Sequence, residues 1–416
     1  MTSKQTLDLN YVRNRFPALK NGFIFMDNAG GSQTLDSVIE NISYYLREHN
    51  VQLGASYKVS QQSGMALEEA HRSIAGFINA SRTEEVVVGP STSMLFRILS
   101  IVLRKNWQKG DEIIVTNSDH EANISPWRDL EAQGIVVKEW KINPETMRFD
   151  MEDLKSLLTG KTRLVTMVHA SNILGTINPI KEIGKLVHEA GSLFCVDGVA
   201  YAPHRMLDMQ EWDVDFYSFS TYKVYGPHLA VMYGKYEILR ELESFNHYFI
   251  GKDEVPYKLQ PGNFNFELTY SLLGLTSYLK NIYVHHFPKL ETKNERSIYK
   301  ESYALMAEHE EALAEKLLDY LNAHAKIKII GEETASKESR VPTISFIHKG
   351  MKSSEIVEKV DEYGIGIRFG DFYAKKIIQD LGLEPYDGVV RVSMVHYNTL
   401  EEVEQLIKAL DTILPT

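Results

Sequence analysis

The chain has 416 residues, with 45 Lys and Arg against 56 Asp and Glu, a formal net charge of -11 and a single cysteine, Cys195. One cysteine excludes an intrachain disulfide framework and any multi-cysteine zinc or iron–sulfur site. The acidic balance argues against general nucleic-acid binding, which needs clustered basic side chains. A chain of this length is expected to form two or three domains.

The first twenty residues are polar and lack the apolar run of a signal peptide. The longest apolar stretch, Leu164–Ile180, contains His169, Asn172 and Pro179, so it is a poor membrane span. We therefore expect a soluble, cytoplasmic protein with neither membrane nor nucleic-acid partners, in which Cys195 stays reduced.

The middle of the chain alternates short apolar runs with helical patterns. The runs predict strands at Glu85–Val88, Glu112–Thr116, Val136–Trp140, Leu164–His169, Leu193–Val196, Phe216–Ser220 and Leu229–Tyr233. The helical patterns predict helices at Ser93–Arg104, Met151–Leu158 and Ile180–Glu189. Because strands and helices alternate, and several strands are continuously apolar, we expect a mostly parallel seven-stranded sheet covered on both faces.

The last third predicts a smaller α+β unit. Its helices are expected at Glu291–Ala325, Ser353–Tyr363 and Thr399–Leu410, and its strands at Lys326–Ile330, Val341–Ile347, Ile365–Phe369 and Val389–Ser393. We predict a large domain over residues 23–285 and a small domain made of residues 1–22 and 286–416.

Polar side chains follow five of the predicted strands, and ligands bind at the carboxyl ends of strands in an open parallel sheet. They are Ser91, Thr92 and Ser93, then His120, then Asn172, then Asp197, and finally Ser220, Tyr222 and Lys223. Each group alone has a simpler interpretation: Ser91 as a helix cap, Asp197 as part of a turn, Lys223 as a surface lysine. Their convergence on one sheet edge favours a shared site.

Pyridoxal 5'-phosphate (PLP) needs this set of groups. It needs a lysine for a Schiff base and a carboxylate to keep its ring nitrogen protonated, and Lys223 and Asp197 match these needs. Hydroxyls at a helix start suit its phosphate, a histidine can stack on its ring, and an amide can reach its phenolic oxygen. The sequence has no GxGxxG, P-loop, HExxH or GxSxG motif that would indicate a different cofactor or reaction, and no metal site is predicted.

The sequence resembles the class V aminotransferase family of fold-type I PLP enzymes, in its cysteine desulfurase-like branch. The matching segments run in order along nearly the whole chain. They are MDNAGGSQ (26–33), GPSTS (89–93), SDHEANISPW (118–127), HASNILGT (169–176), FCVDGVAYAPH (194–204), SFSTYKVYGPH (218–228), PGNFNFE (261–267) and VRVSMVHYNT (390–399).

The resemblance implies a role for each matching position. The Schiff-base lysine falls on Lys223, the pyridine-nitrogen aspartate on Asp197 and the ring-stacking histidine on His120. The remaining cofactor contacts fall on Ser91, Thr92, Asn172, Ser220, Tyr222 and Asn263, and the substrate contacts on Asn28, Ala29 and Arg391. Arg391 suits a substrate carboxylate. The resemblance also implies a homodimer in which Asn263 reaches the partner's phosphate site.

Three positions depart from the family pattern. Tyr373 stands where desulfurases carry their mobile catalytic cysteine, and Ala200 and Tyr222 replace a frequent glutamine and histidine. Cys195 falls in a predicted buried strand, whereas persulfide chemistry needs an accessible thiolate. A persulfide-forming desulfurase is therefore not expected.

The expected function is that of a PLP enzyme acting on an amino acid through a Lys223 Schiff base and an α-carbanion. Overall similarity favours a lyase of the C–S or β-elimination type, with Lys223, His120 and Tyr373 as catalytic residues. An amino-acid epimerase or racemase and an aminotransferase are alternatives. A non-catalytic scaffold with a PLP-enzyme fold is a further one.

Overall fold

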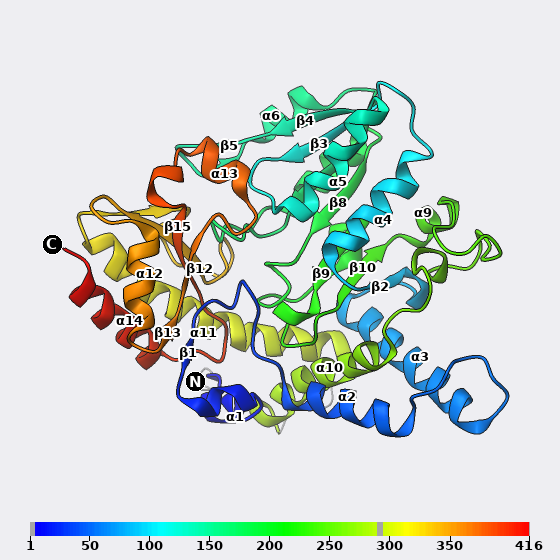
Figure 1. The fold of residues 1–416 in the computed structure, drawn as a ribbon, viewed down its shortest axis with the longest axis horizontal. Helices are drawn as coiled ribbons and strands as arrows, with labels where there is room; N and C mark the ends of the chain where they lie inside the picture. The colour runs from blue at the N-terminus through cyan, green and yellow to red at the C-terminus, as the bar shows by residue number, and fades with distance from the viewer. Residues whose placement is uncertain (1–4, 289–293, 416) are drawn as a thin grey trace.

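The computed structural model describes residues 5–288 and 294–415 and is built around a seven-stranded sheet (Figure 1). The strand order is β2-β10-β9-β8-β7-β3-β4. Their bounds are β2 (Val86–Gly89), β3 (Glu112–Thr116), β4 (Val136–Trp140), β7 (Thr162–Val168), β8 (Leu193–Asp197), β9 (Phe216–Ser220) and β10 (Ala230–Gly234). Only β10 runs against the other six, which confirms the predicted fold class and mostly parallel sheet.

Both faces of this sheet are covered by helices, which explains why its strands are continuously apolar. On β8, Phe194 and Val196 point into one core cluster, and Cys195 points into the other. The first cluster is covered by α2 (Asp36–Glu48), α3 (Lys58–Ile78), α6 (Met151–Leu157), α7 (Ile180–Glu189) and α10 (Phe266–His286). The second is covered by α4 (Thr92–Arg104), α5 (Ser125–Arg128) and α9 (Tyr236–Glu241).

A second, antiparallel sheet has the order β11-β12-β15-β14 and lies beside the first (Figure 1). Its strands are β11 (Ile327–Ile330), β12 (Thr343–His348), β14 (Arg368–Gly370) and β15 (Val389–Ser393). The helices that pack on it are α11 (Glu295–Ala323), α12 (Ser353–Asp361) and α14 (Leu400–Ile413). The expected start of α11 at Glu291 lies outside the described residues.

The predicted strand Ile365–Phe369 is wrong as a single element. The chain changes partners at Ile367, so β13 (Ile365–Gly366) pairs with β1 (Ile24–Phe25) while β14 pairs with β15. The shorter elements are α1 (Leu9–Arg13), α8 (Met209–Trp212), α13 (Lys375–Asp380) and the hairpin of β5 (Ile142–Asn143) and β6 (Arg148–Phe149).

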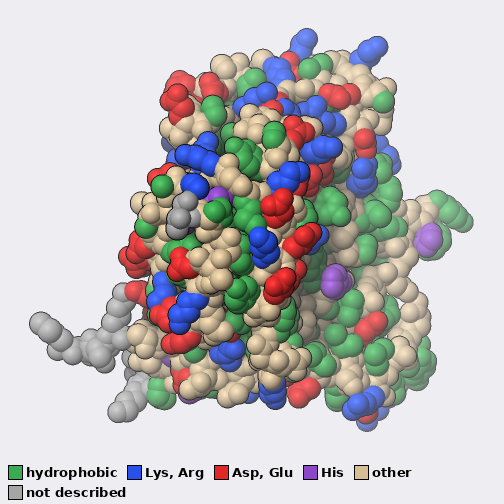
Figure 2. Space-filling model, turned by 60° about the vertical axis from the view of Figure 1, so that its left-hand side comes forward, with side chains coloured by type: hydrophobic (Ala, Val, Ile, Leu, Met, Phe, Trp, Pro, Cys, Tyr) green, Lys and Arg blue, Asp and Glu red, His purple; other side chains and the backbone are tan. Residues whose placement is uncertain are grey.

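The domain boundaries stay a prediction, and the packing near the N-terminus bears on them. Val12 and Phe16 join the core cluster of the large sheet, whereas Ile24 and Met26 join the cluster of the small sheet. The packing therefore favours assigning the residues before 22 to the large domain and those just after it to the small domain. The prediction had the reverse. Over the described residues, no helix combines the length and apolarity needed to cross a membrane. Basic and acidic side chains are interspersed over the face that Figure 2 shows.

Candidate active site

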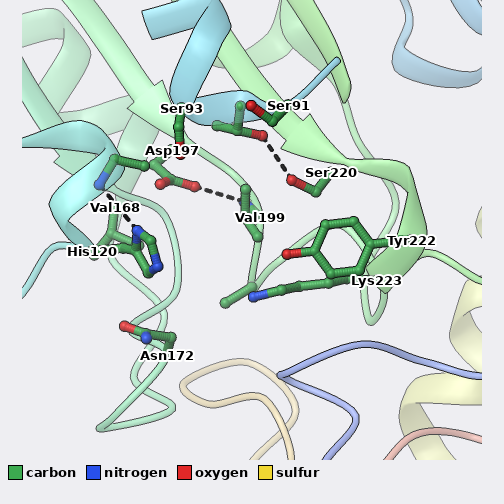
Figure 3. Close-up of a pocket in the computed structure, with 13 residues that line it drawn as sticks. Ser91, Ser93, His120, Val168, Asn172, Asp197, Val199, Ser220, Tyr222 and Lys223 are labelled. Atoms are coloured by element: carbon green, nitrogen blue, oxygen red, sulfur yellow. Dashed lines mark hydrogen bonds between the residues drawn. The ribbon is translucent and has the colours of Figure 1, made fainter. Parts of the chain in front are cut away.

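A pocket lies where β2, β7, β8 and β9 end, and it gathers most of the residues expected from sequence (Figure 3). The order of the sheet makes this possible, because β7, β8 and β9 are neighbours and the segments that follow them meet at one edge. The pocket is lined by Ser91, Thr92, Ser93, His120, Ala122, Val168, Asn172, Asp197, Val199, Ala200, Ser220, Tyr222 and Lys223.

Lys223 ends the short 3-10 turn Thr221–Lys223 that follows β9, and its side chain extends into the pocket. The residue is only 7% exposed. Burial, reinforced by the positive charge of Arg391, lowers the pKa of the Lys223 ammonium to about 8, although Asp197 and Asp27 oppose the shift. About a tenth of the amine is therefore neutral at pH 7, and this neutral form is the one that acts as a nucleophile or base.

Asp197 is the last residue of β8 and its carboxylate is buried. Burial raises its pKa to about 6, while a hydrogen bond from the Val199 N–H (2.9 Å) and the charge of Lys223 favour the ionised form. The next residue must be small: a Cβ on Gly198 would lie 2.0 Å from Cε1 of Tyr217. The glycine is thus required by a close approach to a neighbouring strand.

The hydroxyls of Ser91, Thr92 and Ser220 lie together beside the start of α4, and this group is called here the cup of hydroxyls. Ser91 caps this 13-residue helix by accepting from the Met94 N–H at 3.2 Å. Thr92 Oγ1 and Ser220 Oγ lie 2.8 Å apart. Hydroxyls at a helix N-terminus, where backbone N–H groups are free, suit a phosphate group. Tyr222 closes this side of the pocket, with its ring stacked on His228 at 4.6 Å.

His120 is held as a neutral ring. Its Nδ1 accepts from the Ala122 N–H at 3.0 Å, so the neutral ring carries its proton on Nε2. Burial, followed by the charges of Lys223 and Arg391, lowers the pKa of His120 to about 4. The neighbouring Asp119 is a buried carboxyl whose pKa burial raises to about 7.

Arg391 on β15 is 2% exposed and is held on several sides. Its Nη2 donates to Asp27 Oδ1 at 2.7 Å and its Nη1 donates to the Asn172 carbonyl at 3.2 Å. Its Nε is buried without a hydrogen-bond partner. Asp27 was missed by the sequence analysis, and its position beside Asn28 in the MDNAGGSQ segment was the only signal for it.

Residues Asp371–Ala374, called here the 371–374 turn, bring Tyr373 close to His120. The two ring centroids lie 5.4 Å apart, and Tyr373 is 69% exposed. Phe372 and Tyr373 both have left-handed backbones, with φ of 51° and 58°. This conformation costs a residue with a Cβ roughly 1–2 kcal/mol, so surrounding contacts must hold the turn.

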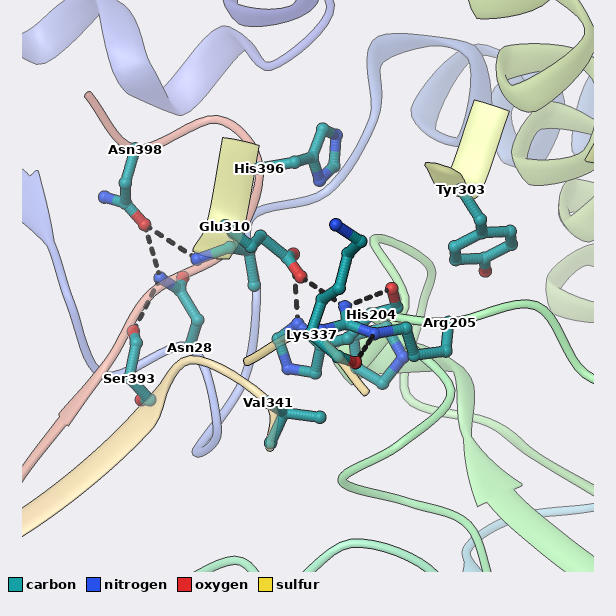
Figure 4. Close-up of polar contacts among 12 residues, drawn as sticks. Asn28, His204, Arg205, Tyr303, Glu310, Lys337, Val341, Ser393, His396 and Asn398 are labelled. Atoms are coloured by element: carbon teal, nitrogen blue, oxygen red, sulfur yellow. Dashed lines mark hydrogen bonds and ion pairs between the residues drawn. The ribbon is translucent and has the colours of Figure 1, made fainter. Parts of the chain in front are cut away.

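None of the three expected substrate residues, Asn28, Ala29 and Arg391, is among the residues that line the pocket, and neither are Asn263 and Tyr373. Asn28 is buried, and its Nδ2 donates to the carbonyls of Phe25 and Ser393, both at 3.0 Å (Figure 4). Its Oδ1 accepts from the Tyr397 hydroxyl, so its side chain joins distant segments of the chain instead of facing a ligand.

Ala29 and Asn263 also make their contacts outside the pocket. The Ala29 N–H donates to Ser393 Oγ at 2.8 Å. Asn263 lines a separate groove and lies 3.5 Å from Gln52 Oε1. Neither residue therefore faces the pocket from within the same chain.

A buried ionic cluster anchors the chain that follows Asp197 (Figure 4). Glu310 on α11 accepts from His204 Nδ1 at 3.0 Å and from Arg205 Nη1 at 2.9 Å. Burial alone would raise the pKa of Glu310, but His204 and Arg205 lower it below its ordinary value. The cluster ties the segment after β8 to the long helix beneath it.

The residues of the pocket fit PLP. Asp197 is a buried carboxylate at the pocket wall, the cup of hydroxyls lies on one side of it, and Lys223 has a pKa of about 8. A protonated ring nitrogen, an anionic phosphate and an aldehyde match these three features in turn.

Comparisons with known proteins agree with this fit. The family model described as aminotransferase class-V matches residues 24–406. The aminotransferase-like protein FGM3 of Gibberella zeae is 44% identical, over 99% of this chain and 100% of that protein. The cysteine desulfurase-like protein ustD of Aspergillus flavus is 34% identical, over 99% and 92%. The nonribosomal peptide synthetase-like enzyme fsqF of Aspergillus fumigatus is 35% identical, but the match spans only 26% of its length.

Solved structures show the same fold. The cysteine desulfurase CsdA of Escherichia coli superposes with a TM-score of 0.82 at 25% identity, covering 98% of each chain. The apo cysteine desulfurase of Thermococcus onnurineus gives a TM-score of 0.85 at 24% identity, covering 99% of each chain. The chain therefore belongs to the class V aminotransferase family, whose members are PLP-dependent enzymes that act on amino acids.

Proposed function

We propose that this enzyme removes the α-proton of an amino acid and then expels a β-substituent, as a lyase of the C–S or β-elimination type. The observation that supports removal of the α-proton is Lys223, a buried amine with a pKa of about 8 in the same pocket as Asp197. When bound, PLP supplies an electron sink that stabilises negative charge at the substrate Cα.

We assign the remaining steps of the reaction to individual residues of the chain. Lys223 holds the cofactor and, once released, takes the α-proton at its Nζ. Asp197 pairs with the ring nitrogen, and His120 stacks on the ring as a neutral group. Asn172 and Tyr222 add polar contacts, and Arg391 binds the substrate carboxylate. Tyr373, whose exposed ring contacts that of His120, gives a proton to the leaving group in this proposal.

Persulfide chemistry is not part of the proposal, because Cys195 is a poor candidate for it. The thiol is wholly buried in the second core cluster, and burial raises its pKa well above the ordinary value. A thiolate nucleophile needs the opposite environment. Tyr373 occupies the position where the desulfurase pattern has its cysteine.

A panel of amino acids tests the reaction type. Pyruvate, or sulfide from a sulfur-containing substrate, is the expected product. The mirror-image amino acid would favour an epimerase, and amine transfer that depends on a keto acid would favour an aminotransferase. Protein that gains no yellow colour with PLP would support the scaffold alternative. Sulfide released through a modified Cys195 would overturn the argument against a desulfurase.

We propose in addition that the active enzyme is a homodimer. Large apolar side chains are exposed on α2 and α3, including Ile39, Leu46 and Met65, and Tyr248 is 100% exposed. A second copy would cover such surface, and it would bring Asn263 to the partner's phosphate cup. Sedimentation should give twice the chain mass of 47.5 kDa; a monomer that is fully active would contradict the proposal.

The uptake of PLP by the apoenzyme should depend on pH through Lys223. Only the neutral amine attacks an aldehyde, and its pKa is lowered to about 8. We expect the uptake rate to rise about tenfold per pH unit below pH 8 and to level off above it. Arg391→Met removes one cause of the lowered pKa, so its profile should shift to higher pH. Stopped-flow absorbance measures both, and a flat profile would contradict the prediction.

A further inference from the structure

Phe372 contacts two residues of the proposed site at once. Its carbonyl accepts from Asn172 Nδ2 at 3.1 Å. The centroid of its ring lies 3.7 Å from the central carbon of the Arg391 guanidinium. Neither contact is predicted by the sequence, since Phe372 stands 200 residues from Asn172 and 19 from Arg391.

The 371–374 turn is tied down at both of its left-handed residues. The Glu121 N–H donates to the Tyr373 carbonyl at 2.7 Å, and the Tyr373 N–H donates to Asp371 Oδ1 at 3.0 Å. Together with Asn172, these contacts hold a backbone that residues with a Cβ rarely adopt. The turn is therefore fixed between the segments that carry His120 and Asn172.

The contacts around Arg391 leave one of its nitrogens without a partner. Asp27 occupies Nη2, the Asn172 carbonyl occupies Nη1, and the Phe372 ring covers one face of the guanidinium. The buried Nε has no partner, although a buried donor without one is costly. A carboxylate that approaches in the plane of the guanidinium would satisfy it, with a charge-assisted hydrogen bond.

We propose that Phe372 is a positioning residue for the substrate carboxylate. Its ring holds the guanidinium of Arg391 in one plane through a cation–π contact, so that Nε stays directed to the incoming carboxylate. The 371–374 turn is then a fixed segment that covers one face of the Arg391 guanidinium. This inference rests on the carboxylate-binding role given to Arg391 in the proposed function.

A matched pair of ligands measures the carboxylate contact without β-elimination, because neither ligand carries a β-leaving group. 2-Methylalanine has an amine and a carboxylate but no α-hydrogen, and isopropylamine is the same molecule without the carboxylate. Titrating each into the holoenzyme, with the cofactor absorbance as readout, gives two dissociation constants. The wild type should bind 2-methylalanine at least about tenfold more tightly, as expected for a charge-assisted hydrogen bond.

Phe372→Leu keeps the carbonyl and apolar bulk but removes the aromatic face. Its preference for 2-methylalanine should fall to less than about threefold, while its affinity for isopropylamine stays within about twofold of the wild type. Phe372→Tyr should keep the wild-type preference, and Phe372→Met should repeat the loss, so the result does not depend on one variant folding. Phe369→Leu is the matched control, because this nearby, exposed phenylalanine lies on β14.

Two results would overturn the inference. An unchanged preference in Phe372→Leu, or an equal loss of affinity for both ligands, would show that the ring does not position Arg391 for the carboxylate. A wild-type enzyme with no preference for 2-methylalanine would instead remove the role of Arg391 on which the inference rests. The two failures are distinguishable because only the second appears in the wild type.

Discussion

Replacing Lys223 with alanine is expected to lower kcat by a factor of about 10³ to 10⁴ or more. The variant loses the proposed base at the substrate Cα, and proton transfer by a positioned side chain contributes about 10²–10⁴ by itself. It also loses the amine that is proposed to hold the cofactor covalently. The measurements are steady-state turnover and mass spectrometry of peptides after borohydride reduction, which should attach the cofactor to Lys223 in the wild type.

Lys258 offers an internal control for this labelling. It is also buried and its pKa is also lowered to about 8, chiefly by burial. Its ammonium is nevertheless occupied, because it donates to the carbonyls of Arg240, Leu242 and Lys252 at 3.1, 2.6 and 2.7 Å. Cofactor recovered on Lys258, or still fixed by borohydride in Lys223→Ala, would contradict the assignment.

Asp197→Asn should produce the second-largest loss, about 10²–10³ in kcat, similar to the loss of one preorganised electrostatic partner in other active sites. An amide is uncharged and cannot hold a proton on the ring nitrogen, so the cofactor becomes a weaker electron sink. The absorbance of the bound cofactor should change together with turnover. Substrate binding through Arg391 should change little, so the loss is expected in kcat rather than in KM.

Asp119→Asn is the matched comparison. Asp119 is equally buried and its pKa is raised to about 7, but it is held by Thr116, by Asn123 and by the Val168 N–H, and it does not line the pocket. This variant should leave the cofactor absorbance unchanged. An equal change of absorbance in both variants would mean that burial of a carboxylate, and not contact with the ring nitrogen, produces the effect.

Local patterns predicted the large sheet well because each of its strands is a short apolar run with a polar end. β3, β4, β9, β15 and α7 have their expected bounds. The same patterns did not single out α2, α3 or α10. α10 is apolar on most sides and packs between other helices, so it lacks the one-sided periodicity by which a surface helix is recognised.

Local patterns predicted a site residue only where it follows a strand of the large sheet, whereas Arg391 on β15 was named through the family resemblance. Lys223, Asp197 and His120 are of that kind, and the structure brings them into one pocket. Asp27 and Phe372 reach the site from the other sheet, through contacts that join distant parts of the chain. Such contacts follow from tertiary packing, which no local pattern encodes, and the buried position of Asn28 was missed for the same reason.

The burial of Cys195 also means that its reactivity can report local unfolding of the protein. Because the only thiol points into the second core cluster, a thiol reagent reaches it only when the helices that cover this face of the sheet move away. The labelling rate of the native protein therefore measures how often this face of the sheet becomes exposed. A cysteine introduced on the surface would, in the folded state, be the single fast-reacting position, ready for a fluorophore or a spin label.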